Sequence, residues 1–256
     1  MVEIYRPCLT CSCNLADIVI AFSLRATNQR FRAPMDQLDP DQLDVWWRRN
    51  GAASGEADGT QIGAANRAPA SHSALRRILA NYGSGGALPP RFIRDGQGKL
   101  RLCDEALSFS ISHGQDFTAF VIANGAEVGI DCEAVTPRPD LMALAEHCFS
   151  AAERARLATI AEHEFLRSFY TFWTRKEALL KAIGVGLSYP MAGLDTANGG
   201  LFSACAVAVP SHGTYWVASI EAPRGYVAAC ASRRSFRVAY RTPGARSVRG
   251  DGDPTG

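Results

Sequence analysis

The sequence has no long hydrophobic run and almost no net charge. Its 256 residues are 47% hydrophobic, yet its apolar stretches are far shorter than a bilayer span. The 27 Lys and Arg against 25 Asp and Glu leave a net charge of +2, which gives little reason to expect general nucleic-acid binding. Asp17 interrupts the apolar stretch near the N-terminus, so no export signal is expected. We therefore expect a cytoplasmic globular protein with neither a membrane nor a nucleic acid as partner.

The sequence also lacks a disulfide framework, although it contains eight cysteines. Five of them stand in scattered apolar surroundings and are typical of small buried side chains in a reducing compartment: Cys103, Cys132, Cys148, Cys205 and Cys230. Cys8, Cys11 and Cys13 cluster, but no second pair of Cys or His at ligand spacing completes a tetrahedral set. A zinc site is not favoured, and the function of the cluster stays open.

Local signals in the first half predict a strand, two helices and a loop. Residues 17–24 are apolar and are predicted to be the first strand. Asp39 as cap and Pro40 at the first helical position predict a short helix that ends near Gly51. The Gly- and Ala-rich residues 51–70 predict a loop. An apolar face followed by Gly83 then predicts a helix over 71–82.

The remaining elements alternate strands with two helices. Residues 106–112 alternate apolar residues with serines, and 117–123 and 127–133 are predicted to continue them as an antiparallel meander. Ser150 and Glu153 have the spacing of a capping box, which begins a helix, and a long aromatic helix follows it. Two more strands are predicted in 214–220 and 226–231.

The order of elements predicts an α+β fold, because strands, helices and strands appear twice. We divide the chain into a loose N-terminal extension, two similar halves and a disordered tail with few apolar residues. The second half carries the candidate metal and catalytic residues. The predicted boundaries are 1–16, 17–125, 126–240 and 241–256.

Two carboxylates lie on one face of a predicted strand. In GIDCE, Asp131 and Glu133 point the same way, while Ile130 and Cys132 point the other way, since strand side chains alternate. Carboxylate oxygens suit magnesium, which takes further oxygens from substrate phosphates. A solvated strand face is the plainer alternative.

A third carboxylate lies on the predicted long helix. In FWTRKEALLKAIGVGL, Glu177 and Lys181 stack one turn apart, beside a stripe of bulky residues at the helical period: Phe165, Phe169, Phe172, Trp173, Leu180 and Ile183. A surface ion pair worth roughly 0.2–0.5 kcal/mol is the alternative for this spacing. Together with the acidic strand, the helix predicts a magnesium-phosphate site.

These segments together resemble the Sfp-type 4′-phosphopantetheinyl transferases, whose hallmark is GxDxE followed by WxxKEAxxK. This chain has GIDCE and WTRKEALLK, with a GxGL segment after the helix. Three further segments resemble the family's SH, FSxxE and GKP segments: FSISH at 109–113, CFSAAE at 148–153 and GKL at 98–100. The resemblance covers about residues 18–231.

The resemblance implies two pseudo-symmetric halves, each with a three-stranded, mostly antiparallel sheet packed with a long helix, and coenzyme A bound between them. It implies a monomer that moves the 4′-phosphopantetheine arm of coenzyme A to a serine of an apo acyl or peptidyl carrier protein and releases adenosine 3′,5′-bisphosphate. Magnesium would be held by Asp131, Glu133 and Glu177. Fatty-acid, polyketide and nonribosomal-peptide carriers all share the serine, so the preferred carrier stays open.

The resemblance also implies contacts to the coenzyme phosphates by Ser112, His113, Lys99 and Lys176. For the 3′-phosphate, the family has an arginine-rich segment where this chain has its Gly- and Ala-rich stretch. Arg67 stands closest to the expected position, with Arg48 and Arg49 as substitutes, and Pro69 is expected to hinder a continuous helix across it.

The chemistry needs a base for the serine proton, and Glu177 is better placed for it than Lys181, although sequence leaves both open. Lys181 would otherwise neutralise the leaving phosphate.

Two other functions compete with this one. A degenerate family member could serve as a binding or scaffold protein, but an intact carboxylate triad would then repel itself without a cation. A magnesium-dependent nuclease also arrays carboxylates near a lysine, but it should show a basic stripe for the phosphate backbone, which this near-neutral chain lacks.

Overall fold

The computed structural model describes residues 38–51, 67–82, 90–103, 107–198 and 204–241, all within one compact unit, Arg32–Pro243. The predicted strand 17–24, the cluster of Cys8, Cys11 and Cys13, most of the Gly- and Ala-rich stretch and the C-terminal tail lie outside the described residues. Among the helices that are described, none has the length and apolarity to cross a membrane.

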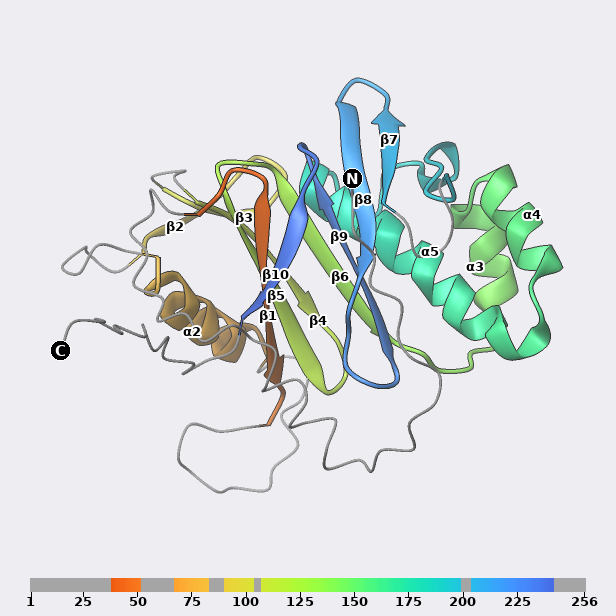
Figure 1. Cartoon of the computed structure of the whole chain (residues 1–256), viewed down its shortest axis with the longest axis horizontal. Helices are drawn as coiled ribbons and strands as arrows, with labels where there is room; N and C mark the ends of the chain where they lie inside the picture. The colour runs from red at the N-terminus through yellow and green to blue at the C-terminus, as the bar shows by residue number, and fades with distance from the viewer. Residues whose placement is uncertain (1–37, 52–66, 83–89, 104–106, 199–203, 242–256) are drawn as a thin grey trace, which may run out of the picture. The chain divides into compact units, whose positions relative to one another are not determined.

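Two four-stranded sheets form the centre of this unit (Figure 1). The first sheet has the order β10 (Arg237–Arg241), β1 (Gln42–Arg49), β5 (Phe117–Asn124), β4 (Leu107–His113). The second has the order β6 (Val128–Ala134), β9 (Tyr226–Ser232), β8 (Gly213–Ile220), β7 (Cys205–Val209). A separate hairpin consists of β2 (Phe92–Arg94) and β3 (Leu100–Leu102).

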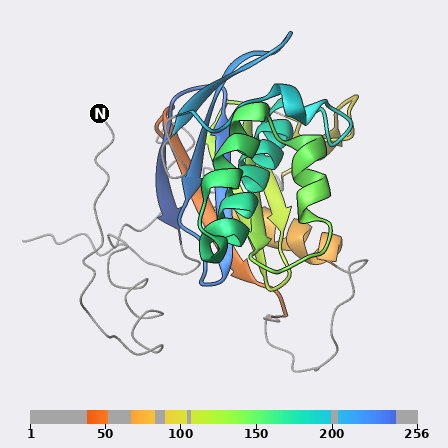
Figure 2. The same cartoon turned by 90° about the vertical axis from the view of Figure 1, so that its right-hand side faces the viewer.

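Helices are packed against both sheets. They are α2 (Arg67–Leu79), α3 (Leu141–Cys148), α4 (Ala151–Thr159), α5 (Glu162–Ile183) and the 3-10 turn η3 (Met191–Gly193). Leu75, Leu79 and Tyr82 of the α2 segment pack on the first sheet, while α5 packs on the second. Figure 2 shows α3 and α4, in green, beside α5, in teal. The predicted α+β class is confirmed; each sheet has four strands where three were expected, and the pseudo-symmetry stays a prediction.

The predicted helix near Asp39 is wrong, because residues 42–49 form strand β1. Asp39 Oδ1 accepts from the backbone N–H of Asp41, so the cap signal belongs to a turn. β1 pairs with β10 on one side and β5 on the other. Its side chains alternate between two hydrophobic cores: Leu43 and Val45 pack into one and Trp46 into the other. Pairing with a strand almost two hundred residues away overrides the local helix signals.

The predicted effect of Pro69 is also wrong. α2 runs from Arg67 to Leu79 and includes Pro69 in its first turn. A proline is tolerated there because the first N–H groups of a helix have no partner within the helix. The predicted capping box is confirmed: Ser150 Oγ accepts from the N–H of Glu153, whose carboxylate accepts from the N–H of Ser150. The helix α3 was not predicted from the sequence.

The strand β6 does not continue the meander, because it pairs with β9 in the second sheet. Its other edge faces β4, where serine side chains replace a backbone partner. Ser110 Oγ accepts from the N–H of Ile130 at 3.3 Å, and Ser112 Oγ from the N–H of Cys132 at 3.2 Å. The serines of the alternating strand thus join the two sheets and bring the end of β4 beside Asp131.

Gly129 allows α5 to lie directly on β6. A Cβ atom at this position would stand 1.9 Å from the carbonyl oxygen of Ala178 and 2.5 Å from the nitrogen of Ala182. Any side chain larger than hydrogen would therefore push the helix away from the strand. Because Glu177 and Lys181 flank the contact on the helix and Asp131 follows it on the strand, this close approach is what assembles the candidate site.

Candidate active site

Asp131 on β6, Ser112 on β4 and Lys181 on α5 form a hydrogen-bonded cluster where the sheets meet. Asp131 Oδ1 accepts from Ser112 Oγ at 2.8 Å and from Lys181 Nζ at 2.7 Å. Lys181 Nζ also donates to Ser112 Oγ at 3.1 Å. The backbone N–H of Cys132 donates to Ser112 Oγ as well. The Ser112 hydroxyl thus donates one hydrogen bond and accepts two, which is its full hydrogen-bonding capacity.

This arrangement corrects the predicted function of Ser112. The side chain is buried and its hydroxyl has no hydrogen-bonding capacity left for a coenzyme phosphate. Its bonds instead fix the orientation of the Asp131 carboxylate. Ser112 is therefore a positioning residue in our description of the site.

The second oxygen of Asp131, Oδ2, is buried and accepts no hydrogen bond from the described part of the chain. A buried carboxylate oxygen without a partner is costly, since its lost hydration is not replaced. Such an atom fits a cation, because magnesium binds carboxylate oxygens. The orphaned oxygen therefore fits a divalent cation.

Glu133 and Glu177 lie near enough to Asp131 to interact with it electrostatically. Burial raises the pKa of Glu133 to about 7, and the Asp131 carboxylate adds to the effect, while a hydrogen bond from Trp173 opposes it. Burial likewise raises the pKa of Glu177 to about 7, with Asp131 as the next cause. Mutual repulsion of this kind is relieved when a divalent cation binds between the groups.

The described residues do not form a closed ligand set as they stand. No three side chains of His, Cys, Asp or Glu among them are close enough together to hold a metal ion. The predicted convergence on one ion thus stays a prediction, although the three carboxylates influence one another electrostatically. One oxygen of Asp131 is occupied by Lys181.

Lys181 is held as an ammonium. Burial opposes the charge, but Asp131 and Glu177 nearby hold the pKa of Lys181 above its usual value. Because this raised pKa keeps the amine protonated at neutral pH, Lys181 lacks the lone pair that a base requires. Glu177, with a pKa of about 7, has the property expected of a base near neutral pH.

Lys176 lies outside this site, which corrects its predicted contact with coenzyme phosphates. Its side chain is fully buried, 2.8 Å from the Glu153 carboxylate, and donates to the carbonyl oxygens of Met191 at 2.8 Å and Leu194 at 2.5 Å. These three acceptors use the three N–H donors of a lysine ammonium. Glu153, expected only to cap a helix, also accepts from Thr196 and so anchors the segment after α5.

The ammonium group of Lys99 donates to backbone carbonyl oxygens, whereas contacts with coenzyme phosphates were predicted. Its Nζ donates to the carbonyl oxygens of Lys181 at 2.5 Å, Ala182 at 3.1 Å and Val128 at 3.2 Å. The structure therefore assigns the lysine of GKL to the junction of α5 and β6.

His113 remains at the rim of the site. It is exposed at the end of β4, and its Nε2 lies 2.9 Å from Ser71 Oγ on α2. Arg48 donates to the carbonyl oxygen of Ala70 on the same helix at 3.4 Å, and Arg49 stands 5.5 Å from the centre of the Phe117 ring. Arg67 begins α2, but its side chain lies outside what the structure describes.

Sequence reasoning missed Trp173 as a site residue and Gly129 as the cause of the close packing. Trp173 hydrogen-bonds Glu133 and stacks on Phe169 with ring centres 6.3 Å apart. The signal was present, because Trp173, Glu177 and Lys181 recur at four-residue spacing and so share one helix face.

Comparison with known proteins agrees with this geometry. Residues 127–231 match the family model of the 4′-phosphopantetheinyl transferase superfamily, and this segment contains every carboxylate of the cluster and Lys181. Over these residues the chain is similar to that superfamily, and the resemblance found in its motifs is confirmed.

Curated relatives carry the same name. The chain is 34% identical over 108 residues to the 4′-phosphopantetheinyl transferase AcpT of Escherichia coli K12, which covers 42% of the chain and 55% of AcpT. It is 29% identical over 171 residues to the 4′-phosphopantetheinyl transferase HetI of Nostoc sp. PCC 7120, covering 62% of the chain and 69% of HetI. The chain thus spans about half the length of the AcpT relatives that it matches.

Proposed function

We propose that this protein is an enzyme that transfers 4′-phosphopantetheine from coenzyme A to a serine of an apo acyl or peptidyl carrier protein, with magnesium. The observation that carries the proposal is the buried Oδ2 of Asp131, which has no hydrogen-bond partner among the described residues and lies near two glutamates with raised pKa values. The names of the relatives support the same reaction. A cytoplasmic monomer with two pseudo-symmetric halves remains part of the proposal.

Magnesium would be held by Asp131, Glu133 and Glu177. When bound, the ion would neutralise charge on the pyrophosphate of coenzyme A during transfer. Lys181 and Ser112 keep Oδ1 of Asp131 occupied, which leaves Oδ2 as its only free oxygen. The residues therefore suit a hard cation that keeps several waters and takes few protein ligands.

The reaction would form a bond between the carrier serine oxygen and the phosphorus that bears the pantetheine arm. The bond from this phosphorus to the bridging oxygen would break, and adenosine 3′,5′-bisphosphate would leave. Glu177 would take the serine proton, since it lies one helical turn before Lys181 on the same face of α5. The Lys181 ammonium would stabilise charge on the phosphates and keep Asp131 in place.

Coenzyme phosphates would contact His113 at the rim, whose imidazole donates a hydrogen bond in either protonation state. His113 and Arg48 both contact α2, which begins at Arg67. We propose Arg48 and Arg67 for the 3′-phosphate in place of an arginine-rich segment. Lys99 and Lys176 are not included, because their donors are used within the fold.

The proposal is tested by incubating the protein with coenzyme A, magnesium and a panel of apo carriers from fatty-acid, polyketide and nonribosomal-peptide synthesis. Intact-mass spectrometry should show the addition of one phosphopantetheine to at least one carrier. A magnesium-free reaction with EDTA and a carrier with its serine replaced by alanine are the controls.

The competing functions give other results in the same experiment. If no carrier gains mass while the protein still binds coenzyme A, the scaffold function replaces transfer. Specific cleavage of a nucleic acid with magnesium at low salt would instead favour a nuclease.

A further inference from the structure

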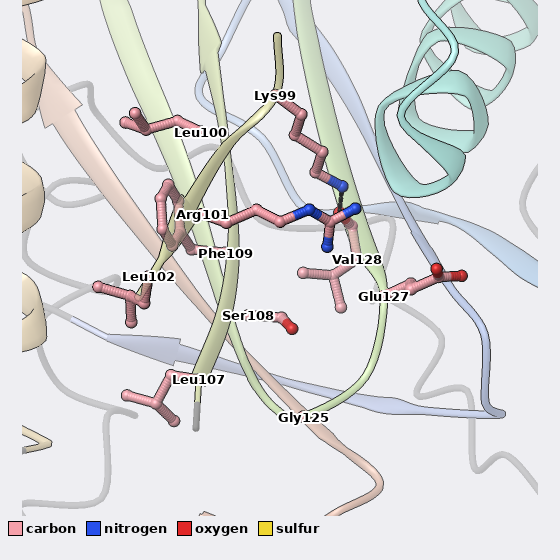
Figure 3. A pocket seen from close by; sticks show the side chains of 10 residues that line it. All are labelled: Lys99, Leu100, Arg101, Leu102, Leu107, Ser108, Phe109, Gly125, Glu127 and Val128. Carbon is pink, nitrogen blue, oxygen red and sulfur yellow. Dashed lines mark hydrogen bonds between the residues drawn. The ribbon is translucent and has the colours of Figure 1, made fainter. Parts of the chain in front are cut away.

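The hairpin β2–β3 reaches the catalytic helix through one side chain. Figure 3 shows the Lys99 side chain extending from the hairpin toward β6, beside Arg101. Lys99 and Arg101 line a pocket together with Glu127 and Val128. Its Nζ contacts three carbonyl oxygens from two elements: two in the last turn of α5 and one at the start of β6. One ammonium group therefore joins the hairpin, α5 and β6.

The backbone around Lys99 is fixed before its side chain leaves the hairpin. Asp95 Oδ1 accepts from the N–H of Lys99 at 2.9 Å, and Asp95 Oδ2 pairs with Arg101 at 2.6 Å. Gly98 has a φ of +83°, a left-handed conformation that a residue with a Cβ atom rarely adopts. The GKL segment thus presents the lysine from a defined turn.

The carbonyl groups that Lys99 contacts are ones the helix cannot satisfy itself. Lys181 and Ala182 stand in the last turn of α5, where carbonyl oxygens have no partner N–H further along the helix. A cation at this end also complements the negative pole of the helix dipole. Lys99 therefore caps the helix at the very residue, Lys181, whose Nζ binds Asp131.

We propose that Lys99 is a positioning residue: it fixes the last turn of α5 against the start of β6, and so holds the Lys181 ammonium at Asp131. This inference rests on the proposed transfer function. The two roles of Lys99, positioning and phosphate contact, predict different kinetic effects when the side chain is removed. A positioning residue affects the rate of the chemical step, whereas a phosphate contact affects the concentration of coenzyme A that is needed.

The first test is backbone amide hydrogen exchange in the free protein, without coenzyme or carrier. Lys99→Met keeps the apolar stem and removes all three donors, and exchange in the last turn of α5 should become about tenfold faster. Arg94→Met is the matched control, because it removes a cation from the same hairpin whose side chain is exposed and donates to Gly98. Equal exchange in wild type and Lys99→Met would overturn the proposal.

The second test is steady-state transfer to a carrier. Lys99→Met should lower kcat about tenfold and leave KM for coenzyme A within about twofold. Lys99→Arg should restore much of the rate, and Lys99→Met should cause no further loss in a Lys181→Met background, since both changes release the same ammonium. A raised KM with unchanged kcat would overturn the proposal in favour of a phosphate contact.

The two tests separate failure of this inference from failure of the proposed function. If wild type transfers to no carrier, the function fails, while exchange still decides whether Lys99 holds α5. If Lys99→Met does not fold, Lys99→Gln, which keeps two N–H donors, is measured instead. Faster exchange confined to the last turn of α5 supports the proposal, and unchanged exchange overturns it.

Discussion

Two lysines of helix α5 each pair with a carboxylate from another element, and the two pairs differ in how many of their polar atoms are hydrogen-bonded. Lys176 and Glu153 are both fully buried, and every donor and acceptor around them has a partner. Lys181 lies five residues further along the helix and pairs with Asp131 of β6. One oxygen of this carboxylate has no partner among the described residues, and two glutamates with raised pKa values lie nearby. The satisfied pair is part of the fold, whereas the unsatisfied pair has capacity left for a cation and a substrate.

Replacing Asp131 is the strongest way to test this contrast. Asp131→Ala should lower the transfer rate about a thousandfold or more, because it removes the proposed metal ligand and the partner of Lys181. The fold should remain, since the half-buried Lys181 ammonium can be hydrated when its partner is removed. Transfer rate by mass spectrometry and circular dichroism of the same sample measure both. Transfer at the wild-type rate would remove Asp131 from the site.

Replacing Lys176 should have the opposite consequence. Lys176→Met leaves the buried Glu153 carboxylate without its counter-charge, so we expect the unfolding free energy to fall by about 3–5 kcal/mol. Urea unfolding followed by fluorescence measures the loss. The rate per folded molecule should stay near wild type, because Lys176 does not reach the acidic site.

The double variant Lys176→Met, Glu153→Gln is the control for this prediction. It removes the uncompensated charge and should recover part of the lost stability. A large rise in KM for coenzyme A in Lys176→Met, without a loss of stability, would instead restore the phosphate contact predicted from the sequence.

The difference between these lysines also shows what could be predicted from the sequence. Lys176 follows Phe165, Phe169 and Phe172 at helical spacing, so the period already placed it on the buried face. The motif match outweighed this signal and assigned it to phosphates. The contact of Asp131 with Lys181 is present in the structure, while the convergence of Asp131, Glu133 and Glu177 on one ion stays a prediction. Strand alternation and the one-turn helix spacing are local properties, so they could be read from the sequence.

Features that depend on distant partners could not be predicted. β1 was predicted as a helix because its pairing with β10 is not encoded near Asp39. The serines of β4 were predicted to share a face, but not to bond the edge of β6. Packing across two sheets decides both, and a single sequence contains no direct signal of it.

Gly129 tests whether the close contact of α5 and β6 is needed for the site. Gly129→Ala would place a methyl group 1.9 Å from the carbonyl oxygen of Ala178. Because this oxygen is a backbone atom of the helix, the clash can be relieved only by moving the helix. We expect a loss of about 3 kcal/mol in unfolding free energy. The rate per folded molecule should fall too, since the helix would carry Glu177 and Lys181 away from Asp131.

The control for this change is Gly193→Ala, because a Cβ atom there meets nothing within 4 Å. Its unfolding free energy and rate should both stay near wild type. Equal stability of the two alanine variants would show that β6 and α5 are less closely packed than the structure indicates.

The smallest effect that we predict is a dependence of stability on pH that magnesium removes. Glu133 and Glu177 have folded-state pKa values of about 7 against an unfolded value of 4.5, mainly through burial. The folded protein therefore binds protons more tightly than the unfolded chain between these values. The stability that this contributes is present below pH 4.5 and is lost as pH rises through about 7.

In metal-free buffer, the melting temperature should thus fall by a few degrees from about pH 5.5 to about pH 8. Magnesium should raise it at the higher pH, where the glutamates are charged, and have little effect at the lower pH, where protons compete for the same oxygens. Glu133→Gln with Glu177→Gln should remove both responses, while Lys176→Met should keep them at a lower melting temperature. If magnesium raised the melting temperature equally at both pH values, or equally in the double glutamine variant, the ion would bind elsewhere. The unsatisfied pair would then need another explanation than metal binding.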